Sequence, residues 1–481
     1  MTDNLNKKVK TATKWSAIAE IAAKLLTPIV SMVLARLLTP EAFGVVTTLT
    51  MIITFAEIFT DAGFQKYLVQ HEFVDDKEKE ESTNVAFWSN LFMSLVIWGI
   101  IAIFADPLAA LVGNPGLGHV LIIACASIPL AAFSSIQMAL YKRDLDFKTL
   151  FKVRIVGIFI PLFVTVPLAF LLRSYWALIF GTLAVNIVNA FLLTWYSKWK
   201  PRFFYSFKLL NDMLSFSIWS MVEQISIWLT NYVDVFIVGT MLTQYYLGLY
   251  KTSSTLVGQI MGLVTAITTP ILFSALSRLQ NDEVAFKEMF FRFQKLVGIL
   301  VIPLGVGIFL FSDIATSILL GNQWTEASSF VGLWALTSSV TIVLSHYASE
   351  VYRAKGKPKL SVLAQSLHII VLWPTVRIAV KYGFEVLYIS RSVVRLELVI
   401  VNVVIMSVLM KISALSMLKN IAPACLSALI MMGVKYLLPS TDSIVMSFVY
   451  IAVCAATYFL VLCMFKEERG ILFNLKNLIK K

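Results

Sequence analysis

The stretch "WSAIAEIAAKLLTPIVSMVLARLLTPEAFGVV", Trp15 to Val46, recurs in altered form as "WSMVEQISIWLTNYVDVFIVGTMLTQYYLGLY", Trp219 to Tyr250. The two copies align without a gap at a constant offset of 204 residues. Both begin with Trp-Ser, and both carry Leu-Thr-x-x-x-[Phe/Leu]-Gly near the end, at 38–44 and 242–248. A gapless match that includes Trp, Ser, Thr and Gly indicates an internal repeat rather than two apolar stretches that agree by chance.

The composition of the chain places both copies in a membrane. Of 481 residues, 58% are hydrophobic and 14% are charged, whereas a soluble domain carries about a quarter charged residues. Uncharged runs such as "SFVYIAVCAATYFLVLCMF" (447–465) approach the roughly twenty residues of a membrane-spanning helix. They lack the period-two alternation of membrane barrel strands. The sequence therefore predicts an all-α polytopic membrane protein.

Charged, Pro and Gly breaks divide the chain into about fourteen spans. We expect the spans near 13–37, 42–65, 84–105, 117–140, 153–172, 175–196, 213–240, 246–275, 296–319, 326–350, 360–380, 384–408, 421–438 and 444–465.

The distribution of Lys and Arg predicts the orientation. With the N-terminus in the cytoplasm, the inside segments hold 31 of the 40 Lys and Arg residues and the outside edges hold 5. Such a bias is the positive-inside rule. The net charge of +12 is then largely an orientation signal that meets anionic lipid of the inner leaflet. Because these residues are spread over eight segments, a nucleic-acid partner is not indicated.

The repeat also predicts how the chain is divided. Copy one begins at the first span and copy two at the seventh, so an even number of crossings separates them and both have the same orientation. We expect two six-helix halves, 1–204 and 205–410, as a parallel repeat around a central cavity. Residues 411–481 would add two transmembrane helices and a basic cytoplasmic tail.

The turn at the end of each copy has a local explanation. Thr39 suits the cap of the following helix, and Pro40 suits its first position. Copy two keeps the cap as Thr243 and replaces the proline by Gln244. We expect a tight hairpin between adjacent helices in both copies.

Six further segments carry a resemblance to a known family. These are "RLLTPEAFGVV", "FTDAGFQKYLVQ", "STNVAFWSNL", "ALYKRDLDFKTL", "GLYKTSSTLVGQIM" and "PILFSALSRLQND". Together they resemble the polysaccharide-export (Wzx-type) branch of the MOP flippase superfamily, and within it the colanic-acid and lipopolysaccharide-repeat translocases. The likeness covers nearly the first 300 residues and continues more loosely to about residue 410.

The resemblance implies a flippase of the bacterial inner (cytoplasmic) membrane with both termini in the cytoplasm. Such proteins turn undecaprenyl-diphosphate-linked oligosaccharide repeat units from the inner to the outer leaflet by alternating access, for surface polysaccharide biosynthesis. The sugar headgroup would pass through the cavity while the lipid tail stays in the bilayer. We expect a monomer that works with polysaccharide assembly proteins.

Four cations within the spans are candidate ligands for the diphosphate. Lys24 lies in the first span, Lys251 in the eighth, and Arg391 and Arg395 share one face of the twelfth. Ionisable groups in a membrane usually face a wet cavity or a partner. Arg offers forked hydrogen bonds to phosphate, and Lys offers a point charge.

Each cation also has a possible acidic partner, which would make it structural. Glu20 precedes Lys24 by four residues, a favourable order for a pair within one helix. Asp234 is placed to meet Lys251 across the hairpin, and Glu397 is near enough in sequence to pair with the two arginines. The sequence leaves both interpretations open.

Carboxylates within the spans are candidates for ion coupling, with H+ or Na+ as the ion. Glu57 and Asp61 lie four residues apart, so they repel each other, and one of them would hold a transferable proton. Glu223 and Asp234 are further candidates. A solvated Asp61 at the membrane interface is the structural alternative.

The sequence offers no chemistry of its own for catalysis. It lacks a P-loop, a Gly-rich dinucleotide turn, C-x-x-C spacing and a Ser/His/Asp constellation, so we expect no enzyme, no cofactor and no metal site. The alternatives are a MATE-like drug/cation antiporter of the same fold, which would favour an acidic cavity, and a membrane-bound glycosyltransferase or polymerase. The sugar composition of the cargo leaves no signature.

Overall fold

The structure, a computed structural model, describes residues 2–61, 63–441 and 443–471; within its helices, the side chains of residues 2–14, 16–17, 215–220 and 222–223 are not among those described. In this part of the chain every regular element is helical. Thirteen helices are long and apolar enough to cross a membrane, and α11 (Phe207–Met241) adds a further helix of 35 residues. The predicted fold class, a polytopic helical membrane protein, is confirmed.

The chain forms two compact units, Met1–Lys251 and Thr252–Lys481. Unit 1 contains α1 (Thr2–Leu37), α2 (Pro40–Asp61), α3 (Phe64–Gln70), α4 (Asp76–Ile103), α5 (Ala105–Leu111), α6 (Gly118–Cys125), α7 (Ser127–Arg143), α8 (Phe147–Ile160), the π-helical turn η1 (Pro161–Thr165), α9 (Val166–Leu172), α10 (Trp176–Tyr196) and α11. Helix α12 (Gln244–Arg278) begins in unit 1 and continues into unit 2.

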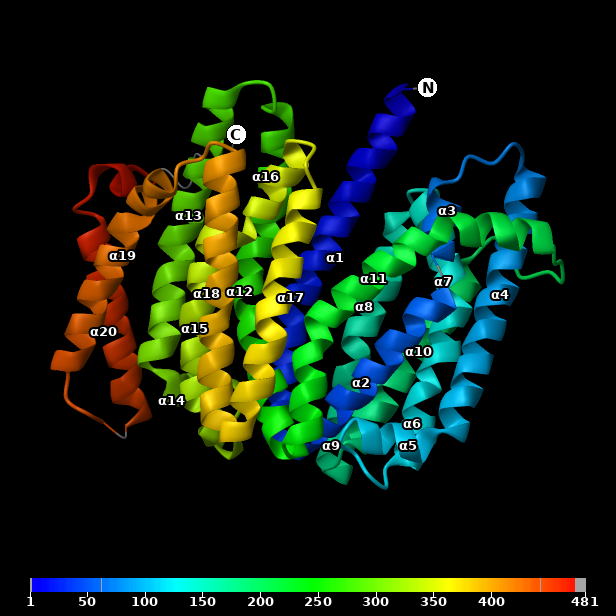
Figure 1. Ribbon diagram of the computed structural model, residues 1–481, viewed down its shortest axis with the longest axis horizontal. Helices are drawn as coiled ribbons and strands as arrows, with labels where there is room; N and C mark the ends of the chain where they lie inside the picture. The colour runs from blue at the N-terminus through cyan, green and yellow to red at the C-terminus, as the bar shows by residue number, and fades with distance from the viewer. Residues whose placement is uncertain (1, 62, 442, 472–481) are drawn as a thin grey trace. The chain divides into compact units, whose positions relative to one another are not determined.

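Unit 2 holds the remaining elements. They are α13 (Glu283–Leu310), α14 (Ser312–Leu319), η2 (Asn322–Ala327), α15 (Ser328–Thr341), η3 (Ile342–His346), α16 (Ala348–Ala354), α17 (Lys359–Ala379), η4 (Val380–Tyr382), α18 (Phe384–Leu409), α19 (Ala414–Leu437) and α20 (Ile444–Leu462). Within the unit, α15 packs between α13 and α18, and α19 packs on both α13 and α20 (Figure 1).

The core of unit 1 is built around α2. Helices α2, α4 and α7 contact one another, and α10 packs against α7 (Figure 1). Helix α11 packs against α2, α3 and α4 in the same unit. By sequence α11 starts the second copy of the repeat, whereas by contacts it belongs with the helices of the first. The boundary between the units, after Lys251, therefore does not coincide with the sequence boundary at 204/205.

The repeated turns meet each other through their glycines. Helix α2 begins at Pro40 and α12 at Gln244, the equivalent positions of the two copies. A Cβ atom added to Gly44 would overlap the carbonyl oxygen of Gln244, and one added to Gly248 would overlap the carbonyl oxygen of Pro40. Each glycine thus gives room to the first helical residue of the other copy. This reciprocal contact explains why both copies carry the Gly of the motif.

The last two helices are fastened to α13 by polar contacts. Asn420 of α19 donates from Nδ2 to the Phe291 carbonyl at 2.8 Å and to Gln294 Oε1 at 3.0 Å. Tyr458 of α20 donates its hydroxyl to the Ile299 carbonyl at 3.0 Å. In an apolar environment such bonds to backbone carbonyls fix the register of one helix on another.

Candidate functional site

A polar cavity of about 330 Å³ lies inside unit 1. Its wall is contributed by α2, α3, α4, α7, α10 and α11. The residues in it most relevant to chemistry are the two carboxylates and the side-chain amides, namely Glu57, Asp61, Asn90, Asn186, Asn189 and Gln224. A cavity with this lining in the middle of apolar helices is a candidate site, because polar groups within a membrane span are costly unless they serve a ligand or each other.

The structure brings the predicted carboxylate pair together in this cavity. Glu57 and Asp61 are both half-buried on α2 and both line the wall. Asp61 Oδ1 is buried and has no hydrogen-bond partner among the described residues. The opposing charge nearby is Lys142, whose Nζ lies 3.4 Å from Oε1 of Gln65, another lining residue.

Asn90 is a site residue that no sequence pattern predicts. It is 1% exposed, and its Nδ2 donates to Ser135 Oγ at 2.6 Å and to the Ala132 carbonyl at 3.4 Å. These two acceptors orient the amide and leave Oδ1 without a partner in the described structure. Its sequence signal is weak, because one Asn in an apolar run carries no charge.

Trp228 of α11 joins the cavity wall to its neighbour helix. Its Nε1 donates to the Met51 carbonyl and to Oγ1 of Thr54, both at 3.2 Å, and Thr54 lines the cavity. The Trp228 ring also stacks on Tyr232 at a centroid distance of 5.5 Å. The α2–α11 contact is thus specified by polar and aromatic groups rather than by shape alone.

Lys24 does not pair with Glu20, the structural partner expected from the sequence. Glu20 accepts a hydrogen bond from Arg154 Nη2 of α8 at 2.8 Å instead of pairing along α1. The half-buried Lys24 makes no hydrogen bond or ion pair to the rest of the described chain. The prediction that Lys24 is a ligand stays a prediction, while its simplest structural alternative is wrong because a residue on another helix takes the carboxylate.

Lys251 and Asp234 each have a protein contact at the hairpin of unit 1. Asp234 is 5% exposed, and its Oδ2 accepts the Tyr250 hydroxyl at 2.6 Å. Lys251 donates from Nζ to the Asn231 carbonyl at 3.5 Å and lies over the Tyr232 ring at 5.2 Å. A ligand at Lys251 would share the ammonium with these groups.

The arginine pair forms a cluster in unit 2 with an aromatic platform. The guanidinium carbons of Arg391 and Arg395 lie 5.2 and 4.0 Å from the centroid of Trp334 on α15. Arg395 also donates from Nη1 to Ser338 Oγ at 2.8 Å. Stacking on an aromatic face leaves the edge of a guanidinium available for forked hydrogen bonds to oxygen.

The acid expected beside the arginine pair bonds to a histidine instead. Glu397 Oε2 lies 2.9 Å from Nδ1 of His368 on α17, and His368 is 5% exposed. No sequence pattern predicts this pair, because its members are on different helices. Unit 2 therefore holds two guanidinium groups and one imidazole–carboxylate pair in neighbouring positions on α15, α17 and α18.

Glu223, the remaining coupling candidate, lies outside the described side chains. The backbone of α11 passes through it, and nothing further follows for its role.

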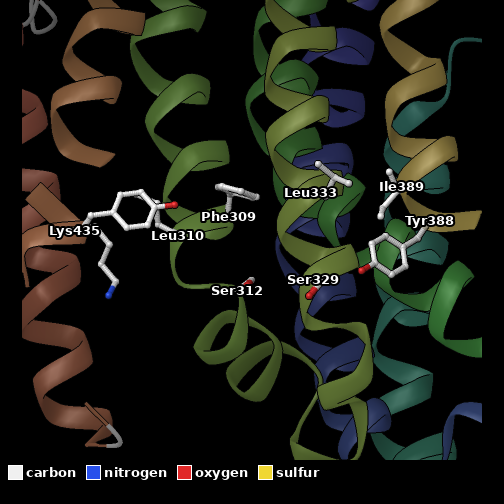
Figure 2. A pocket seen from close by; sticks show the side chains of 9 residues that line it. Phe309, Leu310, Ser312, Ser329, Leu333, Tyr388, Ile389 and Lys435 are labelled. Atoms are coloured by element: carbon white, nitrogen blue, oxygen red, sulfur yellow. The ribbon is translucent and has the colours of Figure 1, made fainter. Parts of the chain in front are cut away.

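A second cavity, of about 430 Å³, lies in unit 2 and is mostly apolar (Figure 2). Figure 2 shows Lys435 on one side and the hydroxyl-bearing Ser329 and Tyr388 on the other. The Lys435 ammonium lies over the rings of Phe311 and Tyr450, at 5.3 and 6.0 Å. Its charge is thus engaged by aromatic faces, and this cavity does not contain the predicted arginine pair.

Comparisons with known proteins agree with this architecture. The succinoglycan biosynthesis transport protein ExoT of Rhizobium meliloti (strain 1021) is 24% identical over 341 residues, which cover 71% of this chain and 68% of that protein. The structure of lipid II flippase MurJ in its inward closed conformation matches with a TM-score of 0.71 at 18% identity, covering 97% of this chain and 100% of that chain.

The same fold occurs in an inward-facing multidrug resistance MATE family transporter of the MOP superfamily. It matches with a TM-score of 0.60 at 16% identity and covers 83% of this chain and 98% of that chain. At these identities the two structures show the fold alone, and the expected MOP fold is confirmed. The sequence itself matches the family described as "Polysaccharide biosynthesis protein" over residues 33–329. This match spans more than half of the chain, and the chain belongs to the polysaccharide biosynthesis protein family.

Proposed function

We propose that this multi-pass membrane protein is a flippase that moves lipid-linked oligosaccharides across the bilayer for polysaccharide biosynthesis. The observation that carries the proposal is the combination of family and fold. The chain belongs to a polysaccharide biosynthesis family, and along nearly its whole length it has the fold of the lipid II flippase MurJ. ExoT, a transport protein of succinoglycan biosynthesis, supports the same class of function.

The finer proposal concerns cargo, membrane and mechanism. We propose undecaprenyl-diphosphate-linked repeat units as the cargo, the bacterial inner membrane as the location and cytoplasmic positions for both termini. The 31 to 5 distribution of Lys and Arg supports this orientation. Alternating exposure of one binding site to the two sides of the membrane would move the headgroup without any covalent chemistry, so the protein would act as a transporter and not as an enzyme.

We propose the four intramembrane cations as ligands of the diphosphate. Arg391 and Arg395 are supported by their shared Trp334 platform, which holds both guanidinium groups in one place. Lys24 is supported by the pairing of Glu20 with Arg154, which leaves its ammonium for another anion. Lys251 would contribute a charge that Asn231 and Tyr232 already orient.

We propose Glu57 and Asp61 as the site where an ion couples to transport. Their placement in one polar cavity supports a role beyond solvation at the interface. Asp234, whose carboxylate is held by Tyr250, is the second candidate. H+ and Na+ are the ions considered for coupling.

A MATE-like exchanger is the second candidate function. The observation that favours it is the same carboxylate-lined cavity, because an acidic site suits a cationic drug. Drug susceptibility of a strain that expresses the protein tests this candidate. Increased resistance to cationic compounds, with no effect on surface polysaccharide, would favour the exchanger.

The proposed function is tested by expression in a strain that lacks its own repeat-unit flippase. We expect the wild-type protein to restore surface polysaccharide and to relieve accumulation of lipid-linked repeat units. Arg391→Ala at matched membrane expression should fail to restore surface polysaccharide. Arg377 lies outside the cluster, with its guanidinium carbon 5.6 Å from the Trp373 ring centroid, and Arg377→Ala should restore surface polysaccharide. Because cargo differs between strains, depletion in the native host is the matched experiment. Normal polysaccharide after depletion would contradict the proposal.

A further inference from the structure

An apolar groove of about 580 Å³ lies in unit 1 and shares no lining residue with the carboxylate cavity. Helices α4, α7 and α10 supply its walls, and both α4 and α10 pack on α7 (Figure 1). The lining side chains are apolar except for Thr194 and Lys200. The groove has the size of a ligand site, since such sites measure roughly 300–1,000 Å³.

The α10 wall of the groove faces the hydrocarbon of the bilayer. Ile187, Phe191 and Trp195 follow one another at four-residue spacing and therefore share one face of the helix. Their side chains are 53%, 61% and 70% exposed. Large apolar side chains that are exposed within a membrane span meet lipid chains. Ala190, on the same wall, is small and leaves room beside them.

One end of the groove is cationic. Lys200 follows the end of α10 and donates from Nζ to the Thr194 carbonyl, which occupies one of the three protons of its ammonium. Lys198 is two residues away, and both lysines are exposed. Within the described part of the chain neither forms an ion pair with a carboxylate, whereas the neighbouring Arg202 pairs with Glu80 at 3.0 Å. Both ammonium groups are thus available to an anion.

An apolar groove that ends at two ammonium groups is complementary to an anionic phospholipid. One acyl chain would lie along the exposed row of α10, and the phosphate would meet the ammonium groups. Basic pockets between transmembrane helices on the cytoplasmic side bind anionic headgroups in this way. Trp195 is near the end of α10, and Trp is enriched at the level of lipid headgroups. Lysines that served orientation alone would need the charge but not the groove beside it.

We propose that this groove binds one anionic phospholipid, with its phosphate at Lys198 and Lys200 and one acyl chain between α7 and α10. The bound lipid would contact α4, α7 and α10 together and stabilise their packing. Its binding goes beyond the proposed function, because it requires neither the cargo nor a coupling ion.

The test is native mass spectrometry of the purified full-length protein in detergent, titrated with phosphatidylglycerol or with phosphatidylcholine. We expect the first phosphatidylglycerol to bind about tenfold or more tightly than the first phosphatidylcholine, because each Lys near an anionic headgroup favours it. Lys198→Ala with Lys200→Ala should abolish this preference. The matched control is Lys357→Ala with Lys359→Ala, two exposed lysines of unit 2 at the same spacing, which should keep it.

A second variant tests the groove separately from the charge. Ile187→Trp fills the groove and leaves both lysines in place, so it should weaken binding of phosphatidylglycerol about fivefold or more through lost acyl-chain burial. Ile187 is 53% exposed, and the variant should therefore fold as wild type does. Thermal unfolding without added lipid checks that it does.

Four outcomes would overturn the proposal. Equal affinity of the wild-type protein for the two phospholipids, or an unchanged preference in the double Lys variant, would show that the lysines select no anionic headgroup. Unchanged binding by folded Ile187→Trp would place the lipid elsewhere. Displacement of phosphatidylglycerol from the wild-type protein by a lower concentration of undecaprenyl phosphate would make the groove a cargo site. None of these measurements requires transport, so failure of the flippase proposal would leave their meaning unchanged.

Discussion

A pair of carboxylates lies in unit 1 and a pair of guanidinium groups lies in unit 2. In unit 1, Glu57 and Asp61 share a cavity with neutral amides, and Asp61 Oδ1 has no hydrogen-bond partner among the described residues. In unit 2, Arg391 and Arg395 share one aromatic platform. The comparison teaches that the repeat preserved a backbone turn, with its two glycines, while the side chains of the two halves took on different chemistry.

This division suits a protein that handles two ligands of opposite charge. A cation at the two carboxylates of unit 1 and a diphosphate at the arginine pair of unit 2 would each find an environment of complementary sign. Changes at the arginine pair should then alter cargo handling, and changes at the carboxylates should alter ion dependence. The following predictions test that separation, beginning with the largest expected effect.

Removing both guanidinium groups should have the largest effect. Arg391→Ala with Arg395→Ala should reduce cargo transport about 100-fold or more, because two charge-assisted hydrogen bonds are each worth about 1.5–3 kcal/mol. Transport of lipid-linked oligosaccharide in proteoliposomes measures it. The double Lys variant should recover only part of the rate, because Lys keeps the charge and loses the fork. Full transport activity of the double Ala variant would show that the arginine pair does not bind the cargo.

Neutralising Glu57 should change how transport responds to ions. We expect Glu57→Gln to lower the rate about tenfold and to abolish its dependence on the gradient of the coupling ion, while cargo binding is retained. Rates are compared in vesicles with and without a proton gradient, and with and without a sodium gradient, at constant ionic strength. If the variant instead loses affinity for cargo and keeps its ion response, the two units are not separated as proposed.

The shared turn should be sensitive to volume rather than charge. Gly248→Ala should destabilise the protein by about 1–3 kcal/mol, since the new Cβ meets the Pro40 carbonyl. Gly258→Ala on the same helix meets nothing within 4 Å and should stabilise it slightly, because Ala is the better helix former. Thermal unfolding of the purified variants measures both changes. Equal stability of the two variants would show that the turns do not pack as described.

The two lysines of unit 1 should have the smallest effects and should differ from each other. Lys24→Ala should slow transport about fivefold, on the scale of about 1 kcal/mol for one hydrogen bond. Lys251→Ala should cost less, because Asn231 and Tyr232 already engage its ammonium. The exposed Lys208→Ala is the control. If Lys24→Ala transports cargo at the wild-type rate, Lys24 is not a cargo ligand and instead extends its ammonium to the membrane surface.

Much of the fold could be predicted from the sequence, because membrane spans are long uncharged runs. The position of Pro40 at the start of α2 also followed from local chemistry. Contacts between helices could not be predicted. Glu20 binds Arg154 and Glu397 binds His368, and in both cases the partner is on another helix. A single sequence contains no information on which helix faces meet.

The candidate site could be predicted only in part, because contacts between helices could not be predicted. Charged residues in apolar runs stand out, so Glu57, Asp61 and the arginine pair were identified. Asn90 was not predicted as a site residue, since a neutral amide in a span gives no such signal, and the bonds from Trp228 to α2 were not predicted either. Their roles depend on the contacts of α4 and α11 with α2, which only the fold supplies.

The most direct measurement is the movement of lipid-linked oligosaccharide in proteoliposomes. Purified wild-type protein is reconstituted with undecaprenyl-diphosphate-linked repeat units from the native host, and a lectin or hydrolase that cannot cross the membrane is added outside. If the protein is a flippase, all of the oligosaccharide becomes accessible to the added lectin or hydrolase, whereas protein-free vesicles expose only the outer-leaflet share. If vesicles with protein also expose only that share and accumulate a cationic drug, the account is contradicted and the protein is an exchanger.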